Sequence, residues 1–191
     1  KKKFKSFSHN FALGERNKKL DLYIPLHNWG GAFILDKNNT YNKKILSNKD
    51  GYKSFNEKNY LKKKITVKKS KEVLSRIFYN LSKKNYHKGI IKIDVEGYEA
   101  TILKGIAEAI PKKTQLFIIF ENFKPDLDLN KIIDSFNRKI KIYKIVRDIP
   151  WKENWPDFLK GISMLIKGKI NTKILDPDGK NWKGHIIMHV K

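Results

Sequence analysis

The chain has 191 residues, enough for one domain with a sizeable core, and it has no cysteine, which excludes disulfides, cysteine nucleophiles and cysteine-bound zinc. Its apolar runs fall well short of the roughly 20 residues of a transmembrane helix, so we expect a cytoplasmic protein with no membrane span. The formal net charge is +23, but nearly all the basic residues are lysines, which lack the bidentate fork of arginine, so we expect no specific nucleic-acid partner.

The sequence of the first part of the chain predicts two strands and a long polar segment on the surface. Residues 3–11 predict a strand that no leader, cap or turn precedes, and residues 20–24 predict another. Residues 36–64 are polar, rich in asparagine and lysine and only weakly periodic. We therefore expect a surface excursion there, either a lid over a substrate or a plain mobile loop.

The middle of the chain predicts a strand, a helix and a second strand. After a helix over residues 72–81, the apolar run 90–93 predicts a strand, and residues 99–110 predict a helix that Pro111 ends. Residues 115–120 form a second apolar run. A helix of this length carries the chain back across the sheet, so the two strands are expected to be parallel.

The last part predicts a short helix over residues 130–136 and strands over residues 140–146, 162–166 and 185–190. Two other groups of residues are weaker site candidates. His185 and His189 share a strand face but have no third ligand, so a structural role is favoured over metal binding. Trp151 and Trp155 either stack on a sugar or base or, as we favour, anchor a loop.

Polar residues gather where the two parallel strands end. Asp94 and Glu96 follow the first strand, and Glu121 and Asn122 end the second. Ligands of open α/β sheets bind beyond the carboxyl ends of the strands, so these residues are candidates for an active site. Gly97 allows a sharp turn or a close approach to a ligand. The alternative is that these are ordinary loop carboxylates at a helix N-terminus.

Residues 91–99 (IKIDVEGYE), followed by ILKG at 102–105 and the strand ending at Glu121, resemble the signature of the FkbM-type methyltransferases. Residues 10–15 and 28–32 also follow the pattern of that family, so the resemblance covers about residues 4 to 123. It implies an α/β, Rossmann-like methyltransferase fold with a mostly parallel sheet and helices on both faces. It also implies S-adenosylmethionine as cofactor and a hydroxyl oxygen of a sugar, glycan or related metabolite as methyl acceptor.

The chain departs from the family pattern in two places. Residues 70–74 lack the leucine–aspartate pair expected before the helix, and no glycine-rich turn lies between a strand and a helix. That turn and the acidic residue for the ribose belong before the matching segment. We therefore expect residues 1–191 to be one methyltransferase domain that is truncated at its N-terminus and lacks its first strand–helix units.

The resemblance also implies roles for particular residues. Asp94 is the first choice for a base or positioning residue and also for a cofactor contact, with Glu96 and Glu121 as the other catalytic candidates. The adenine edge falls at Ala12 and Leu13. The expected substrate contacts are Gly97, Asn122 and His27, and no residue is assigned to a metal.

Three alternatives remain open. A metal-dependent nuclease would use the same carboxylates and suit the basic surface, although the usual Glu-x-Lys pairing is not made after Glu121. A basic nucleic-acid-binding module would carry out no chemistry. A methyltransferase remnant would keep the acceptor half of the domain and bind no cofactor.

Overall fold

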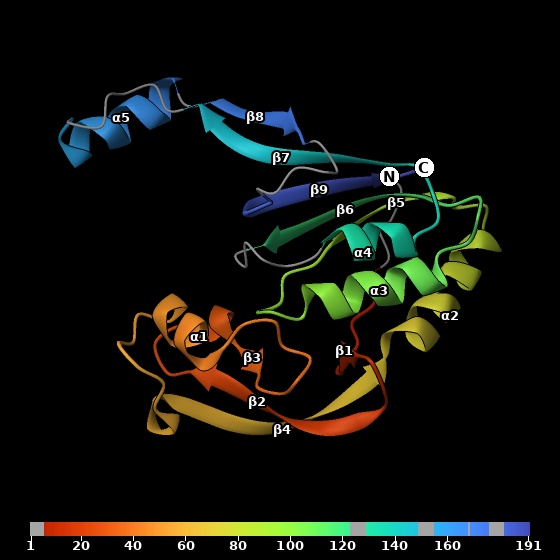
Figure 1. The fold of residues 1–191 in the computed structure, drawn as a ribbon, viewed down its shortest axis with the longest axis horizontal. Coiled ribbons are helices and arrows are strands. Elements are labelled where there is room, and N and C mark those ends of the chain that lie inside the picture. Colours follow the sequence, from red (N-terminus) through yellow and green to blue (C-terminus); the bar gives the residue numbers. More distant parts are fainter. Residues whose placement is uncertain (1–5, 123–128, 149–154, 168, 176–181) are drawn as a thin grey trace.

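The computed structural model covers the whole chain, and it describes residues 6–122, 129–148, 155–167, 169–175 and 182–191. In this part of the chain, two β-sheets lie on either side of a layer of helices (Figure 1). The first sheet comes from the N-terminal part of the chain and the second from the C-terminal part. The chain is thus a mixed α/β protein.

The first sheet has the strand order β1-β4-β2-β3. Its strands are β1 (Ala12–Gly14), β2 (Lys18–Pro25), β3 (Phe33–Ile34) and β4 (Tyr60–Lys69). Only β1 and β4 are parallel, and the long β2–β4 pair is antiparallel. The prediction of a strand over residues 20–24 is confirmed. Of residues 3–11, the described positions 6–11 form no strand, and the strand begins at Ala12 because β4 pairs only with residues 12–14.

Residues 36–64 were expected to be a surface excursion, but they contain regular structure. They include helix α1 (Lys43–Lys49), a 3₁₀ turn η2 (Glu57–Asn59) and the start of β4, while another turn, η1 (Trp29–Gly31), precedes β3. Tyr41, Leu46 and Tyr60 are buried together with Tyr23 and Phe33. These widely spaced and mostly aromatic residues build a small core over the first sheet, which a periodicity argument misses because few of them fall on one regular element.

The second sheet has the order β5-β6-β9-β7-β8. Its strands are β5 (Lys88–Lys92), β6 (Gln115–Asn122), β7 (Ile140–Asp148), β8 (Lys169–Ile174) and β9 (Gly184–Val190). The parallel pairing of β5 and β6 confirms the predicted strand–helix–strand unit. The expected mostly parallel sheet is wrong, because β9 inserts antiparallel between β6 and β7, and β8 is antiparallel to β7.

The helices α2 (Ser70–Ser82), α3 (Glu99–Ala109) and α4 (Leu129–Ser135) pack side by side in one layer. Helix α3 contacts β1 of the first sheet and β6 of the second, so it joins the two halves of the molecule. Its residues Leu103 and Ile106 are fully buried in the main core. The three helices confirm the predictions over residues 72–81, 99–110 and 130–136.

The last helix, α5 (Asp157–Lys167), replaces the strand predicted over residues 162–166. The apolar run there is too short to distinguish strand from helix, and the helical spacing becomes clear only when Phe158 is included. The strands predicted over residues 140–146 and 185–190 are confirmed as β7 and β9. Among the described residues, no helix combines the length and apolar character needed to cross a bilayer.

Candidate active site

The candidate carboxylates lie where β5 and β6 end. The two strands are in parallel register, with Lys92 beside Ile119, and the Ile93 amide donates to the Ile119 carbonyl at 2.8 Å. The residues that follow each strand therefore emerge at the same edge of the sheet. The structure brings Asp94 and Glu96 to the edge at which Glu121 ends β6, as the sequence predicts.

Asp94 is the most accessible of the carboxylates. Its side chain is 68% exposed, and the Lys92 ammonium group donates a hydrogen bond to it. That bond, the Asp94 charge and the more distant Glu121 charge together raise the pKa of Lys92. Lys92 thus lies within the field of both strand-end carboxylates. Nothing in the sequence distinguishes it from the many other lysines.

Glu96 is held by a residue from the first half of the chain. Lys49, at the end of α1, forms an ion pair with its carboxylate, and both side chains are largely shielded from solvent. This contact ties the α1 segment to the loop after β5. The segment that was expected to be a surface excursion therefore contributes directly to the candidate site.

The turn after Glu96 is fixed by residues 39–41. The Asn39 amide donates to the carbonyls of Ile34 at 2.7 Å and Glu96 at 2.9 Å. The Thr40 amide donates to the Gly97 carbonyl at 2.8 Å. Gly97 has φ +83°, and a Cβ there would lie 1.9 Å from Asn39 Oδ1. This contact gives a structural reason for the glycine, and the substrate contact expected of Gly97 stays a prediction.

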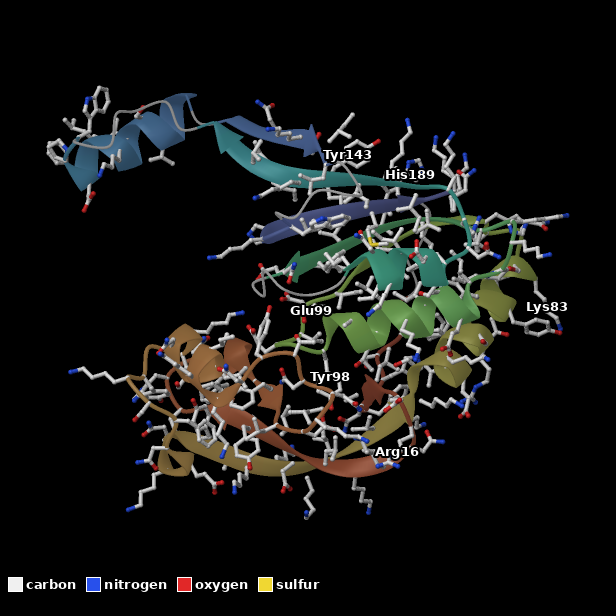
Figure 2. All side chains as sticks on the ribbon, viewed as in Figure 1. Arg16, Lys83, Tyr98, Glu99, Tyr143 and His189 are labelled. Atoms are coloured by element: carbon white, nitrogen blue, oxygen red, sulfur yellow. The ribbon has the colours of Figure 1, made fainter. Side chains whose placement is uncertain are left out.

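The start of α3 holds two buried polar side chains between the sheets (Figure 2). Tyr98 donates a hydrogen bond to Asp36, which also accepts one from Lys18 at 2.6 Å. Burial of Asp36 raises its pKa, but the hydrogen bonds from Lys18 and Tyr98 outweigh burial and hold that pKa below its usual value. Sequence reasoning found neither Asp36 nor Lys18.

Glu99 is the second of these residues and is only 3% exposed. Burial outweighs the hydrogen bonds from its own amide and the Gly97 amide, and raises the pKa of Glu99 to about 7. The sequence predicts a carboxylate in the first helical turn, where it suits the helix dipole. The structure adds that this carboxyl group changes charge near neutral pH.

At the end of β6, Glu121 and Asn122 have different surroundings. Glu121 is partly exposed and lies 3.1 Å from Nδ1 of His185. Asn122 is buried and donates to the Trp182 carbonyl at 3.1 Å, which gives it a structural contact where a substrate contact was expected. The ring of His189 stacks on Phe117.

The remaining candidates do not join this edge. His27 is exposed, and its ring lies 6.2 Å from that of Tyr52 over the first sheet. Trp155 is 40% exposed, and residue 151 lies outside the described residues. Within the described residues, no three histidine, aspartate or glutamate side chains are grouped so that they could hold a metal ion.

A cavity of about 450 Å³ lies between the first sheet and the end of β5, and we call it the β1–β5 cavity. Ala12 and Leu13 of β1 line it together with Asp94 and Glu96. Most other lining residues are apolar, from β2, β3, β4, α2 and α3. The structure therefore brings the residues predicted for the cofactor and two of the predicted catalytic residues to one cavity. Its volume falls in the range of small-molecule sites.

Comparison with known proteins gives one match. Searches of curated proteins and of solved structures found no protein that matches the chain. The family described as methyltransferase FkbM domain matches residues 1–141. This segment contains β1 to β6, α1 to α4 and all the residues that line the β1–β5 cavity. The chain therefore belongs to the FkbM methyltransferase family.

Proposed function

We propose that the protein transfers a methyl group from S-adenosylmethionine to a hydroxyl oxygen of a sugar, glycan or related metabolite. Membership of the FkbM methyltransferase family supports the reaction type. The observation that carries the proposal is the β1–β5 cavity, which Asp94 and Glu96 line together with Ala12 and Leu13.

The lining of this cavity fits the proposed cofactor. Its apolar side chains suit the face of a purine ring, for which Ala12 and Leu13 are the proposed contacts. The carboxylate of Asp94 suits the hydroxyl or ammonium groups of the same molecule. When bound, S-adenosylmethionine would supply a methyl group on a positively charged sulfur, which needs no further activation.

The residues of the chain would then align the acceptor and remove its proton. Asp94 would accept the proton of the acceptor hydroxyl, and the oxygen would be held in line with the methyl group that the cofactor supplies. The large exposed fraction of Asp94 lets an acceptor approach from solvent. Glu96 is the second candidate for this role, and Glu121, beside His185, would accept a hydrogen bond from another hydroxyl of the acceptor.

The replacement Asp94→Asn tests this assignment. General-base assistance is worth about 10² to 10⁴ in rate, so methyl transfer from labelled S-adenosylmethionine to a panel of sugars and glycans should fall by about that factor. Asp21→Asn is the matched control, because Asp21 also pairs with a lysine on the surface, at 3.2 Å from Lys64, but lies on β2. Equal rates in both variants would remove Asp94 from the mechanism.

A further inference from the structure

Helix α5 turns large apolar side chains toward solvent. Phe158 is 67% exposed, Ile162 is 50% exposed and Leu165 is 89% exposed. Their spacing of four and three residues places them on one face of the helix. Single apolar side chains on a surface are ordinary, but three on one helical face form a patch that usually marks a contact.

Nothing in the described part of the chain covers this face. Helix α5 makes no substantial contact with any other helix or strand there. Figure 1 shows it projecting beyond β7 and β8 at one end of the molecule. An unpacked helix of 11 residues is marginal in water, because most helical stability in proteins comes from packing of the apolar face. The helix therefore needs a surface against which to pack.

The polar side of the helix and the charge of the chain indicate the kind of surface. Lys160 lies two residues after Phe158, about 200° around the helix axis and so on the opposite side, where it pairs with Asp157 at 3.0 Å. Trp155, which is 40% exposed, lies just before the helix. An aromatic and aliphatic face opposite a polar, charged side is typical of helices that lie in a membrane interface. The net charge of +23 adds attraction to anionic lipid.

We propose that α5 anchors the protein to the surface of an anionic lipid bilayer, with Phe158, Ile162 and Leu165 inserted among the headgroups. Stable attachment of this kind needs two signals, and the chain supplies both an apolar helical face and a basic surface. Strand β8, on the same projecting part of the molecule, exposes Ile170 and Ile174 and adds apolar area. The family match ends at residue 141, so this helix lies outside it.

Sedimentation with vesicles tests the anchor. Vesicles of phosphatidylcholine with about one-third phosphatidylglycerol should bind the purified protein, and added salt or neutral vesicles should weaken binding. Leu165→Asp should weaken binding at least about tenfold, because it removes a large apolar group from the inserted face and adds a negative charge. Leu61→Asp is the matched control, since Leu61 is 57% exposed on β4, and it should leave binding within about twofold.

Circular dichroism of each variant confirms that it is folded. Loss of binding in Leu165→Asp alone supports the anchor. Absence of wild-type binding to anionic vesicles at low salt would overturn it, and so would equal weakening by the two replacements, which would indicate attraction by scattered lysines only. A concentration-dependent dimer in solution that Leu165→Asp abolishes would also overturn it, in favour of a second copy of the chain on this face.

Discussion

The buried carboxyl group of Glu99 should make the stability of the protein depend on pH. Its pKa is raised by burial from an ordinary 4.5 to about 7 in the folded state. Below about pH 4.5 the group is protonated in both states and costs nothing. As pH rises from about 4.5 to about 7, the carboxyl group ionises in the unfolded state before it ionises in the folded state, so the free energy of unfolding falls. Above about pH 7 the loss is complete and stays constant.

The size of the loss follows from the two pKa values. One pKa unit corresponds to about 1.4 kcal/mol, so the difference between 4.5 and about 7 corresponds to about 3 kcal/mol. Glu99→Gln removes the charge and keeps the oxygen that accepts from the Gly97 amide. The new amide hydrogens need partners, which costs about 1 kcal/mol at every pH. The variant should therefore be more stable than the wild type by about 2 kcal/mol near pH 8 and slightly less stable near pH 4.5.

Urea unfolding monitored by tryptophan fluorescence at a series of pH values measures this difference, and subtraction of the two curves cancels all other titrating groups. Glu72→Gln is the matched control, because Glu72 also lies in the first turn of a helix but is 54% exposed. Its stability difference from the wild type should stay within about 0.5 kcal/mol. A stability difference for Glu99→Gln that is constant from about pH 4.5 to about pH 8, or that falls with rising pH, would show that burial does not raise the pKa of Glu99.

Two further replacements test how the site is held together. Gly97→Ala should destabilise the fold by about 3 kcal/mol, because the new Cβ would displace Asn39 and because alanine is strained at a positive φ. Gly51→Ala is the control: Gly51 has φ +78° but open space around it, so the replacement should cost only about 1 kcal/mol in the same urea titration. Equal costs would mean that the contact with Asn39 is unimportant. Tyr98→Phe should lower the free energy of unfolding by about 1 to 2 kcal/mol, because it loses the hydrogen bond to Asp36. Its control, Tyr79→Phe at an exposed position, should lower it by under about 0.5 kcal/mol, as measured by thermal unfolding.

The central unit of the fold could be predicted from sequence because its signals are local. The apolar run of β5, the helical spacing of α3 and the stop at Pro111 lie within about 25 residues, and together they require parallel strands. The position of β9 between β6 and β7 could not be predicted in this way. It depends on pairings between strands that are distant in the sequence, and an apolar strand carries no mark of its partner.

The candidate site also has features that local sequence predicts and features that depend on long-range contacts. The edge occupied by Asp94 and Glu121 follows from strand direction, so the sequence predicts it. The lysine partners of the carboxylates, Lys92 for Asp94 and Lys49 for Glu96, do not follow from sequence, because they look like any other lysine in a lysine-rich chain. The burial of Glu99 depends on how the α1 segment and the loop at Asn39 fold over the turn, which only the tertiary structure provides.

Calorimetric titration of the protein with S-adenosylhomocysteine is a direct test of cofactor binding, because it requires no knowledge of the methyl acceptor. We expect saturable binding of one molecule per chain, with weaker binding when Leu13→Asp places a charge in the apolar lining of the β1–β5 cavity. Absence of binding by protein that circular dichroism shows to be folded would contradict the claim and would favour a family member that has lost its cofactor.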